Sequence, residues 1–100
     1  MAVGTATIDF GALPGGSDAS VVVTGQTGIA ANSSVEAWVV PTANADHNAD
    51  EHIVEGLRIY AGNIVPGTGF TIYAIHDHGE TLTGSDHFAW GDFSLAWAWV

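Results

Sequence analysis

Polar and apolar residues alternate with a period of two along several short stretches of the chain. Between residues 5 and 10, for example, Ala6, Ile8 and Phe10 fall on one side of an extended backbone. Further runs rich in Val, Ile, Thr and aromatic residues span 19–24, 35–40, 51–60, 70–75 and 88–100. No stretch shows the 3.6-residue period of an amphipathic helix. The pattern therefore predicts an all-β chain.

Turn residues separate these runs. Glycine and proline gather at 13–18, Gly28 lies within 25–33, and Pro41 closes the third run. Residues 42–50 are small and polar and are expected to form the longest surface loop, with further turns at 61–69 and 76–84. Gly56 interrupts the fourth run and suggests a bulge or bend there. Six to eight short strands in 100 residues predict a compact antiparallel β-sandwich, a single domain spanning 1–100.

The last run has a bulky side and a small side. Leu95, Trp97 and Trp99 alternate with Ala96, Ala98 and Val100. Because successive strand residues point to opposite faces, the bulky side is expected in the core or in an interface. The small side would let another sheet or subunit approach closely.

The charge balance excludes several partners. Arg58 is the only strong base against 11 acids, so the formal net charge is -10. Such a chain repels phosphate backbones and anionic membranes, and it has no apolar run long enough to span a bilayer. We therefore expect no nucleic-acid binding and no membrane insertion. Arg58 should pair with a carboxylate, Glu36 or Glu55 being candidates, within the chain or across a subunit boundary.

Total charge is low as well: charged residues make up 12% of the chain, against roughly 25% in an average domain. Low charge is typical of proteins whose surface is partly covered in an assembly. The simpler interpretation is an acidic globular domain with no such partner.

Histidines and acids form two groups, at 46–55 and 76–87. Imidazole and carboxylate ligands together can hold a divalent ion, and His76 and His78 would share one side of an extended strand. We favour the alternative that both groups are solvated loop residues, with no metal and no cofactor. The chain has no cysteine, no nucleophile elbow and no phosphate-binding loop, which predicts that it is not an enzyme.

The four tryptophans are the other candidate binding residues. Trp97 and Trp99 are expected in the core or an interface, whereas Trp38 and Trp90 could also stack on sugar rings. Together with Arg58, these side chains are the residues that we expect at an oligomer or particle interface.

Parts of the chain resemble known families. The run at 35–41 (V-E-A-W-V-V-P), the acidic histidine loop after it, residues 63–72 and the terminal W-A-W strand follow the order of H-type lectin-like, jelly-roll-like β-sandwiches. Residues 7–11 (T-I-D-F-G), 45–52 (A-D-H-N-A-D-E-H) and 67–72 (G-T-G-F-T-I) are similar to small structural proteins of tailed bacteriophages. The lectin likeness implies a trimer or hexamer but transfers no sugar-binding residue.

The phage resemblance implies a virion structural accessory protein, a subunit docked on the particle as capsid decoration, capsid cement or a tail-associated protein. Its partners would be further copies of itself, as a homotrimer, and other capsid or tail subunits. The alternative is a receptor-binding or glycan-binding tail-fibre or adhesin domain that recognises a host-surface glycan. The sequence shows no coiled-coil or repeat shaft, which favours direct docking.

Overall fold

The computed structural model describes residues 1–12, 15–54, 56–76 and 89–100. The elements in these ranges are nearly all strands: β1 (Ala2–Asp9), β2 (Asp18–Val23), β3 (Val35–Val39), β4 (Leu57–Val65), β5 (Gly69–His76) and β6 (Asp92–Trp99), with one short helix, α1 (Ala49–Val54). They form two antiparallel three-stranded sheets, which confirms the prediction of a small all-β sandwich.

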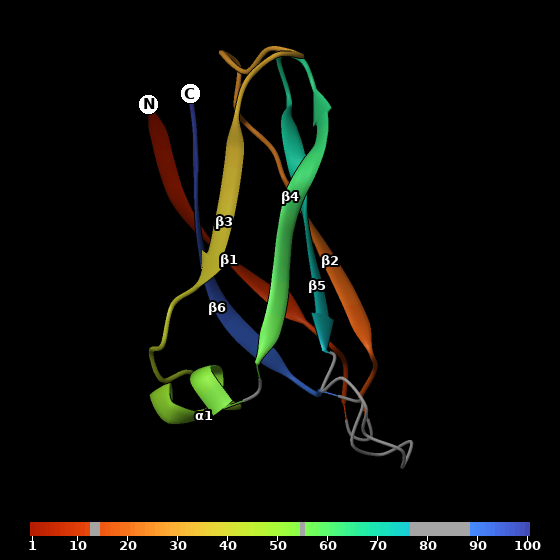
Figure 1. Cartoon of the computed structure of the whole chain (residues 1–100), viewed down its shortest axis with the longest axis vertical. Coiled ribbons are helices and arrows are strands. Elements are labelled where there is room, and N and C mark those ends of the chain that lie inside the picture. The colour runs from red at the N-terminus through yellow and green to blue at the C-terminus, as the bar shows by residue number, and fades with distance from the viewer. Residues whose placement is uncertain (13–14, 55, 77–88) are drawn as a thin grey trace.

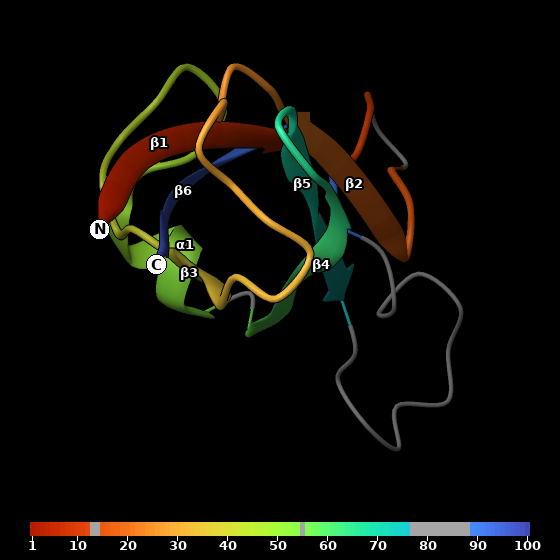
Figure 2. The ribbon, with the colours of Figure 1, turned by 90° about the horizontal axis from the view of Figure 1, so that it is seen from above.

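The strands are ordered β1-β6-β3 in one sheet and β2-β5-β4 in the other (Figure 1). Among the described strands, β4 and β5 alone are neighbours both in sequence and in a sheet, and every other connection crosses between the sheets. The central strand of each sheet, β6 in one and β5 in the other, is one of the last two strands in sequence. The termini lie side by side at the end opposite α1, where Ala2 pairs with Trp99 (Figures 1 and 2).

The core lies between the two central strands. Phe70 of β5 and Trp97 of β6 meet edge to face, with ring centroids 5.4 Å apart and an interplanar angle of 79°. Ile8, Ile72 and Phe93 are completely buried around them. Leu95 and Trp97 point inward and Ala96 and Ala98 outward, as the alternation of the last run predicts.

Trp97 also packs over β1. It lies directly opposite Gly4 in the strand register, and a Cβ atom at Gly4 would overlap the indole ring. The indole Nε1–H donates to the backbone oxygen of Thr5 at 3.3 Å. The ring therefore covers the glycine, and any larger residue at position 4 would displace it from the core.

The fourth predicted strand is wrong over its first half. Residues 51–60 were expected as one strand, but α1 occupies Ala49–Val54 and β4 begins at Leu57. A capping box explains the helix: Asn48 Oδ1 accepts from the Glu51 N–H at 2.9 Å, and Glu51 Oε1 accepts from the Asn48 N–H at 2.8 Å. Gly56, with φ of +65°, closes the helix instead of forming a bulge in a strand.

The turn expected at 61–69 is much shorter than predicted. Strand β4 continues through Val65, and the register shift lies between Gly62 and Val65, where Asn63 has φ of +51°. Pro66 and Gly67 then form the hairpin turn, closed by a 3.0 Å hydrogen bond from the Thr68 N–H to the Val65 oxygen. Proline followed by a glycine with positive φ is the signature of a type II turn.

Removing the central indole should unfold the protein far more readily than removing an exposed one. We expect Trp97→Ala to lower the free energy of unfolding by about 3–5 kcal/mol, because it leaves a cavity beside Phe70. The matched control Trp38→Ala removes a side chain that is 45% exposed and should cost about 1 kcal/mol or less. Urea denaturation measures both, and equal losses would contradict the assignment of Trp97 to the core.

Candidate functional site

The described histidines of the two His and acid groups are not solvated as expected. His47 and His52 retain only 5% and 2% of their exposure, and His76, at the end of β5, is buried as well. Residues 40–52, here called the clamp segment, lie against the start of β6. The interpretation of these histidines as solvated side chains is therefore wrong.

The clamp segment replaces a missing strand. The β3–β6 ladder ends at the pair Val39–Leu95, followed by one bond from the Val40 N–H to the Ser94 oxygen. Beyond that point the backbone groups of residues 90–94 on this edge of β6 have no strand to pair with. Buried backbone groups without a partner are costly, so other groups must take the place of β3.

Side chains supply those partners. His52 Nε2 accepts from the Ser94 N–H at 3.0 Å, and Asp46 Oδ2 accepts from the Asp92 N–H at 2.8 Å. Asn44 Nδ2 donates to the Asp92 oxygen at 2.9 Å, and His47 Nε2 donates to the Trp90 oxygen at 2.6 Å. The four side chains thus continue the hydrogen-bond ladder of β6 at residues 90, 92 and 94.

The partners of His52 also fix its tautomer. The Ser94 N–H can only donate, so Nε2 accepts, and the Asn48 oxygen can only accept, so Nδ1 carries the proton at 2.8 Å from it. The ring lies edge-on to Phe93, with centroids 5.2 Å apart, while the His47 ring stacks on Phe93 at 4.3 Å. Both histidines are therefore structural side chains in an aromatic layer beneath the sheet.

An acidic group lies beside this clamp. Asp92 is paired with Asp9 across β1 and β6, and its backbone contacts Asp46. Partial burial, reinforced by the negative charges of Asp9 and Asp46, raises the pKa of Asp92 above its ordinary value of 3.8, and His47 offsets part of that rise. The carboxylate of Asp92 is thus destabilised in the folded protein.

Nothing in the described part of the chain assembles these groups into a metal site. No set of three or more His, Asp or Glu side chains is placed to hold an ion within those ranges. Of the possible pair His76 and His78, position 78 lies outside the described residues. Of the described helices, none has the length and apolar character needed to cross a membrane.

The outer faces of the sheets offer the exposed surfaces. On β2-β5-β4 the outward residues, here called the tyrosine face, form rows across the sheet: Asp18, Ile75 and Arg58 in one row and Ser20, Tyr73 and Tyr60 in the next. Val22 continues the face, whereas its partner Thr71 is buried. A groove of about 440 Å³ runs over it, between Asp18 and Tyr60.

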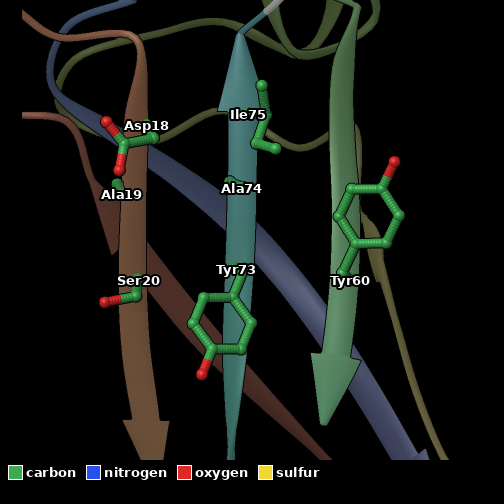
Figure 3. A pocket seen from close by; sticks show the side chains of 7 residues that line it. All are labelled: Asp18, Ala19, Ser20, Tyr60, Tyr73, Ala74 and Ile75. Carbon is green, nitrogen blue, oxygen red and sulfur yellow. The ribbon is translucent and has the colours of Figure 1, made fainter.

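Two large aromatic side chains dominate the tyrosine face. Tyr60 is 52% exposed and Tyr73 is 39% exposed, and they are the chain's only two tyrosines. Figure 3, a view onto this face, shows both rings turned broadside to the viewer, with Asp18 and Ile75 beyond them along the strands. Because these side chains stand on rigid strands, the face is a preformed contact surface.

The other sheet carries a second exposed surface. Its outward residues, here called the tryptophan face, include Val3, Trp38, Ala96, Ala98 and Val100. Trp38 and Tyr60 also border a groove of about 390 Å³ between β3 and β4, beside Glu36. Small central residues are thus flanked by Trp38 on this surface.

The residues expected at an interface are dispersed through the fold. Trp97 belongs to the core, and Trp99 is partly buried with its Nε1–H donating to Gln26 Oε1 at 2.9 Å. Trp90 packs on His47 with centroids 4.7 Å apart. Trp38 and Arg58 alone remain on exposed faces.

Sequence reasoning missed the two tyrosines. The signal was present: Tyr60 lies between Ile59 and Ala61, and Tyr73 lies between Ile72 and Ala74, so inward aliphatic residues flank an outward aromatic in both strands.

Comparison with known proteins adds no further assignment, since no family model, curated protein or solved structure matches this chain.

Replacing His52 by phenylalanine tests how much the imidazole contributes to the hydrogen-bond ladder of β6. We expect His52→Phe to lower the free energy of unfolding by about 1–3 kcal/mol, because the buried Ser94 N–H loses its acceptor. Ile53→Phe places the same residue at the exposed neighbouring position of α1 and should be nearly neutral. A His52→Phe protein as stable as the native one in urea would show that the ladder does not need the imidazole.

Asp92 should make stability depend on pH. A carboxyl whose pKa is raised by folding binds its proton more tightly in the folded chain, so its contribution becomes increasingly unfavourable as pH rises above 3.8. Asp92→Asn should therefore melt at a higher temperature than the native protein at pH 7, with the difference vanishing as pH falls toward 3.8. Asp50→Asn is the exposed control, and a pH-independent difference for Asp92→Asn would contradict this assignment.

Proposed function

We propose that this chain is a non-enzymatic structural subunit of a tailed-bacteriophage particle, docked directly on the capsid or tail. The observation that carries the proposal is that both outer faces of the sandwich present large exposed apolar side chains: Val22, Tyr60, Tyr73 and Ile75 on one, and Val3, Trp38 and Val100 on the other. Contiguous exposed apolar residues mark contact surfaces in small proteins. A subunit within an assembly uses more than one such surface.

The distribution of polar groups supports a structural role. His47, His52, Asn44 and Asp46 are all engaged with backbone groups of residues 90–94. Such groups hold the fold together, as expected of a structural subunit. The phage resemblance of residues 7–11, 45–52 and 67–72 supplies the kind of assembly.

We assign the tryptophan face to the particle. Its central residues, Ala96 and Ala98, are small and lie on a regular strand, so a flat protein surface can approach the sheet closely. Trp38 stands at the edge of this surface, where a large aromatic side chain can fill a pocket of the partner. Trp38 is therefore the expected anchor.

A second candidate function is glycan recognition. Trp38 and Tyr60 border the groove between β3 and β4, with the Glu36 carboxylate beside them. Aromatic faces next to a polar acceptor suit the apolar and hydroxyl-bearing sides of a sugar ring. The net charge of -10 would restrict such a ligand to a neutral or basic saccharide.

The structural proposal predicts the chain in purified particles. Mass spectrometry of particles from the phage that encodes it should find the protein at a fixed copy number, and particles made without the gene should take up the added protein. Trp38→Ser should fold normally but lose most of this uptake, whereas Ile53→Ser removes an equally exposed apolar residue on α1 without effect. Absence of the protein from particles would refute the proposal, and saturable binding of a neutral glycan by the isolated protein would favour the second candidate.

A further inference from the structure

We propose that the groove between β3 and β4 binds a cationic side chain, the ammonium or guanidinium group of a basic residue on the docking partner. This inference rests on the proposed function for its partner, and it names the chemistry by which the edge of the tryptophan face recognises that partner. Three side chains that border the groove carry it: the Glu36 carboxylate and the rings of Trp38 and Tyr60.

The groove lies where the two sheets meet along one side of the sandwich. Strands β3 and β4 are edge strands of different sheets, and each is hydrogen-bonded to the central strand of its own sheet. They run side by side in opposite directions (Figure 1). No ladder joins these two strands, so the seam stays open as a groove of about 390 Å³.

The floor of the groove is aliphatic. Its residues are Val35 and Ala37 of β3 and Ile59 and Ala61 of β4, all partly buried against the core. They point inward, since they alternate with the exposed residues of their strands. Such a floor suits the methylene stem of a lysine or arginine, which packs on apolar surface while its charged end stays near water.

Two aromatic rings border the groove from opposite strands. Trp38 of β3 is 45% exposed and Tyr60 of β4 is 52% exposed. Figure 3 shows the Tyr60 ring extending from β4 on the side away from β5. A cation within about 6 Å of such a ring is attracted by the negative face of its π-system, most strongly at tryptophan. Both rings are therefore placed to attract a cation that enters the groove.

Glu36 supplies the negative charge. Its side chain is exposed beside that of Trp38, because residues 36 and 38 share the outer side of β3. Their neighbours on β6 are Ala98 and Ala96, whose side chains cannot donate a hydrogen bond. Within the described part of the chain, the Glu36 carboxylate forms no ion pair and no side-chain hydrogen bond. An incoming cation can pair with it without displacing another partner.

The charge of the protein favours a basic ligand. The formal net charge is -10, and Glu36 is the one charged residue among the described residues that line the groove. Arg58, two residues before Tyr60 on β4, is not part of this lining. A basic segment is therefore attracted to the protein at long range and positioned by a single carboxylate at short range.

The same lining argues against a neutral sugar. A sugar ring carries hydroxyl groups around its edge, and each one that is buried needs a hydrogen-bond partner. The described side chains of the groove offer two polar ends, the Glu36 carboxylate and the Tyr60 hydroxyl. A cation on an apolar stem needs one acid, one aromatic face and an aliphatic floor, and the groove has all three.

The groove orients a partner more than it holds one. An exposed ion pair and an exposed cation–π contact each raise affinity by only about a few-fold. A free ammonium compound should therefore bind in the millimolar range. The flat surface around Ala96 and Ala98 would supply most of the contact area, while the cation fixes where the partner lies on it.

A nuclear magnetic resonance titration with Nα-acetyl-lysine methylamide tests the site in the native protein. We expect the indole resonances of Trp38 and the ring resonances of Tyr60 to shift along one saturable curve, while those of the core residue Trp97 stay in place. The same compound with its ε-amine acetylated keeps the stem but loses the charge, and it should shift neither ring.

Charge-matched variants separate the site from general attraction. Glu36→Gln should weaken binding of the ammonium compound about threefold or more, because it removes the paired carboxylate. Asp50→Asn makes the same change in net charge at an exposed position of α1 and should bind as the native protein does. Circular dichroism establishes that both variants are folded, and equal losses in the two would contradict the site.

Uptake by particles then tests the partner. Glu36→Lys places a cation at the groove and should lower uptake about tenfold, because it repels the basic side chain that the groove receives. Asp50→Lys makes the same change of charge on α1 and should leave uptake unchanged. If both variants are taken up like the native protein, this inference fails while the proposed function stands.

Two further outcomes would overturn the inference. One is a native protein whose Trp38 and Tyr60 resonances do not respond to the ammonium compound at about 100 mM. The other is a neutral saccharide that binds this groove more tightly than the ammonium compound does. A protein that binds the ammonium compound in the groove but is never found in particles would instead refute the proposed function and leave the ligand chemistry of the groove in place.

Discussion

The edge-to-face contact between Phe70 and Trp97 is the interaction on which the rest of this fold depends. It joins the central strands of the two sheets, whereas the backbone hydrogen bonds of each described strand ladder stay within one sheet. Since strand side chains alternate, placing Phe70 inward sends Tyr73 and Ile75 outward, and placing Trp97 inward sends Ala96 and Ala98 outward. The character of both outer faces follows from this one packing choice.

The edge of β6 imposes a second constraint. Strand β3 stops opposite Leu95 and does not reach the start of β6. The backbone groups at residues 90–94 on this edge would therefore lack partners without the clamp segment. His52, Asp46, Asn44 and His47 provide those partners from a loop whose composition looks suited to ligand binding. Residue types that often build a metal or catalytic site here complete a sheet, and the exposed apolar faces are left as the candidate functional surfaces.

The sequence predicted the fold better than the site. Alternation in the first and last runs, and β-branched and aromatic residues in the others, identified β1, β2, β3, β5 and β6 and the inward face of the last strand, because each depends on local pattern. It failed at 51–60, where the Asn48–Glu51 capping box begins a helix that the hydrophobic pattern does not reveal. The tyrosine face was missed because it depends on register: nothing local says that residues 18, 58 and 75 stand in one row.

The burial of the histidines was also beyond sequence reasoning. His47 and His52 lie in a polar stretch, and their burial follows from where β3 stops relative to β6. Arg58, which the sequence singled out for pairing with a carboxylate and for an interface, lies exposed on β4. Its relation to Asp18, however, appears only when the two edge strands are placed on either side of β5.

The central claim is that the tyrosine face is a contact surface of the folded protein. Because Tyr60 and Tyr73 are the only tyrosines in the chain, tyrosine-selective nitration reports on this face and, through Tyr60, on the adjoining groove between β3 and β4. We expect both residues to be nitrated in the free, folded protein and to be protected together in the assembled particle. Tyrosines that react equally in the free protein and in the assembled particle would contradict the account.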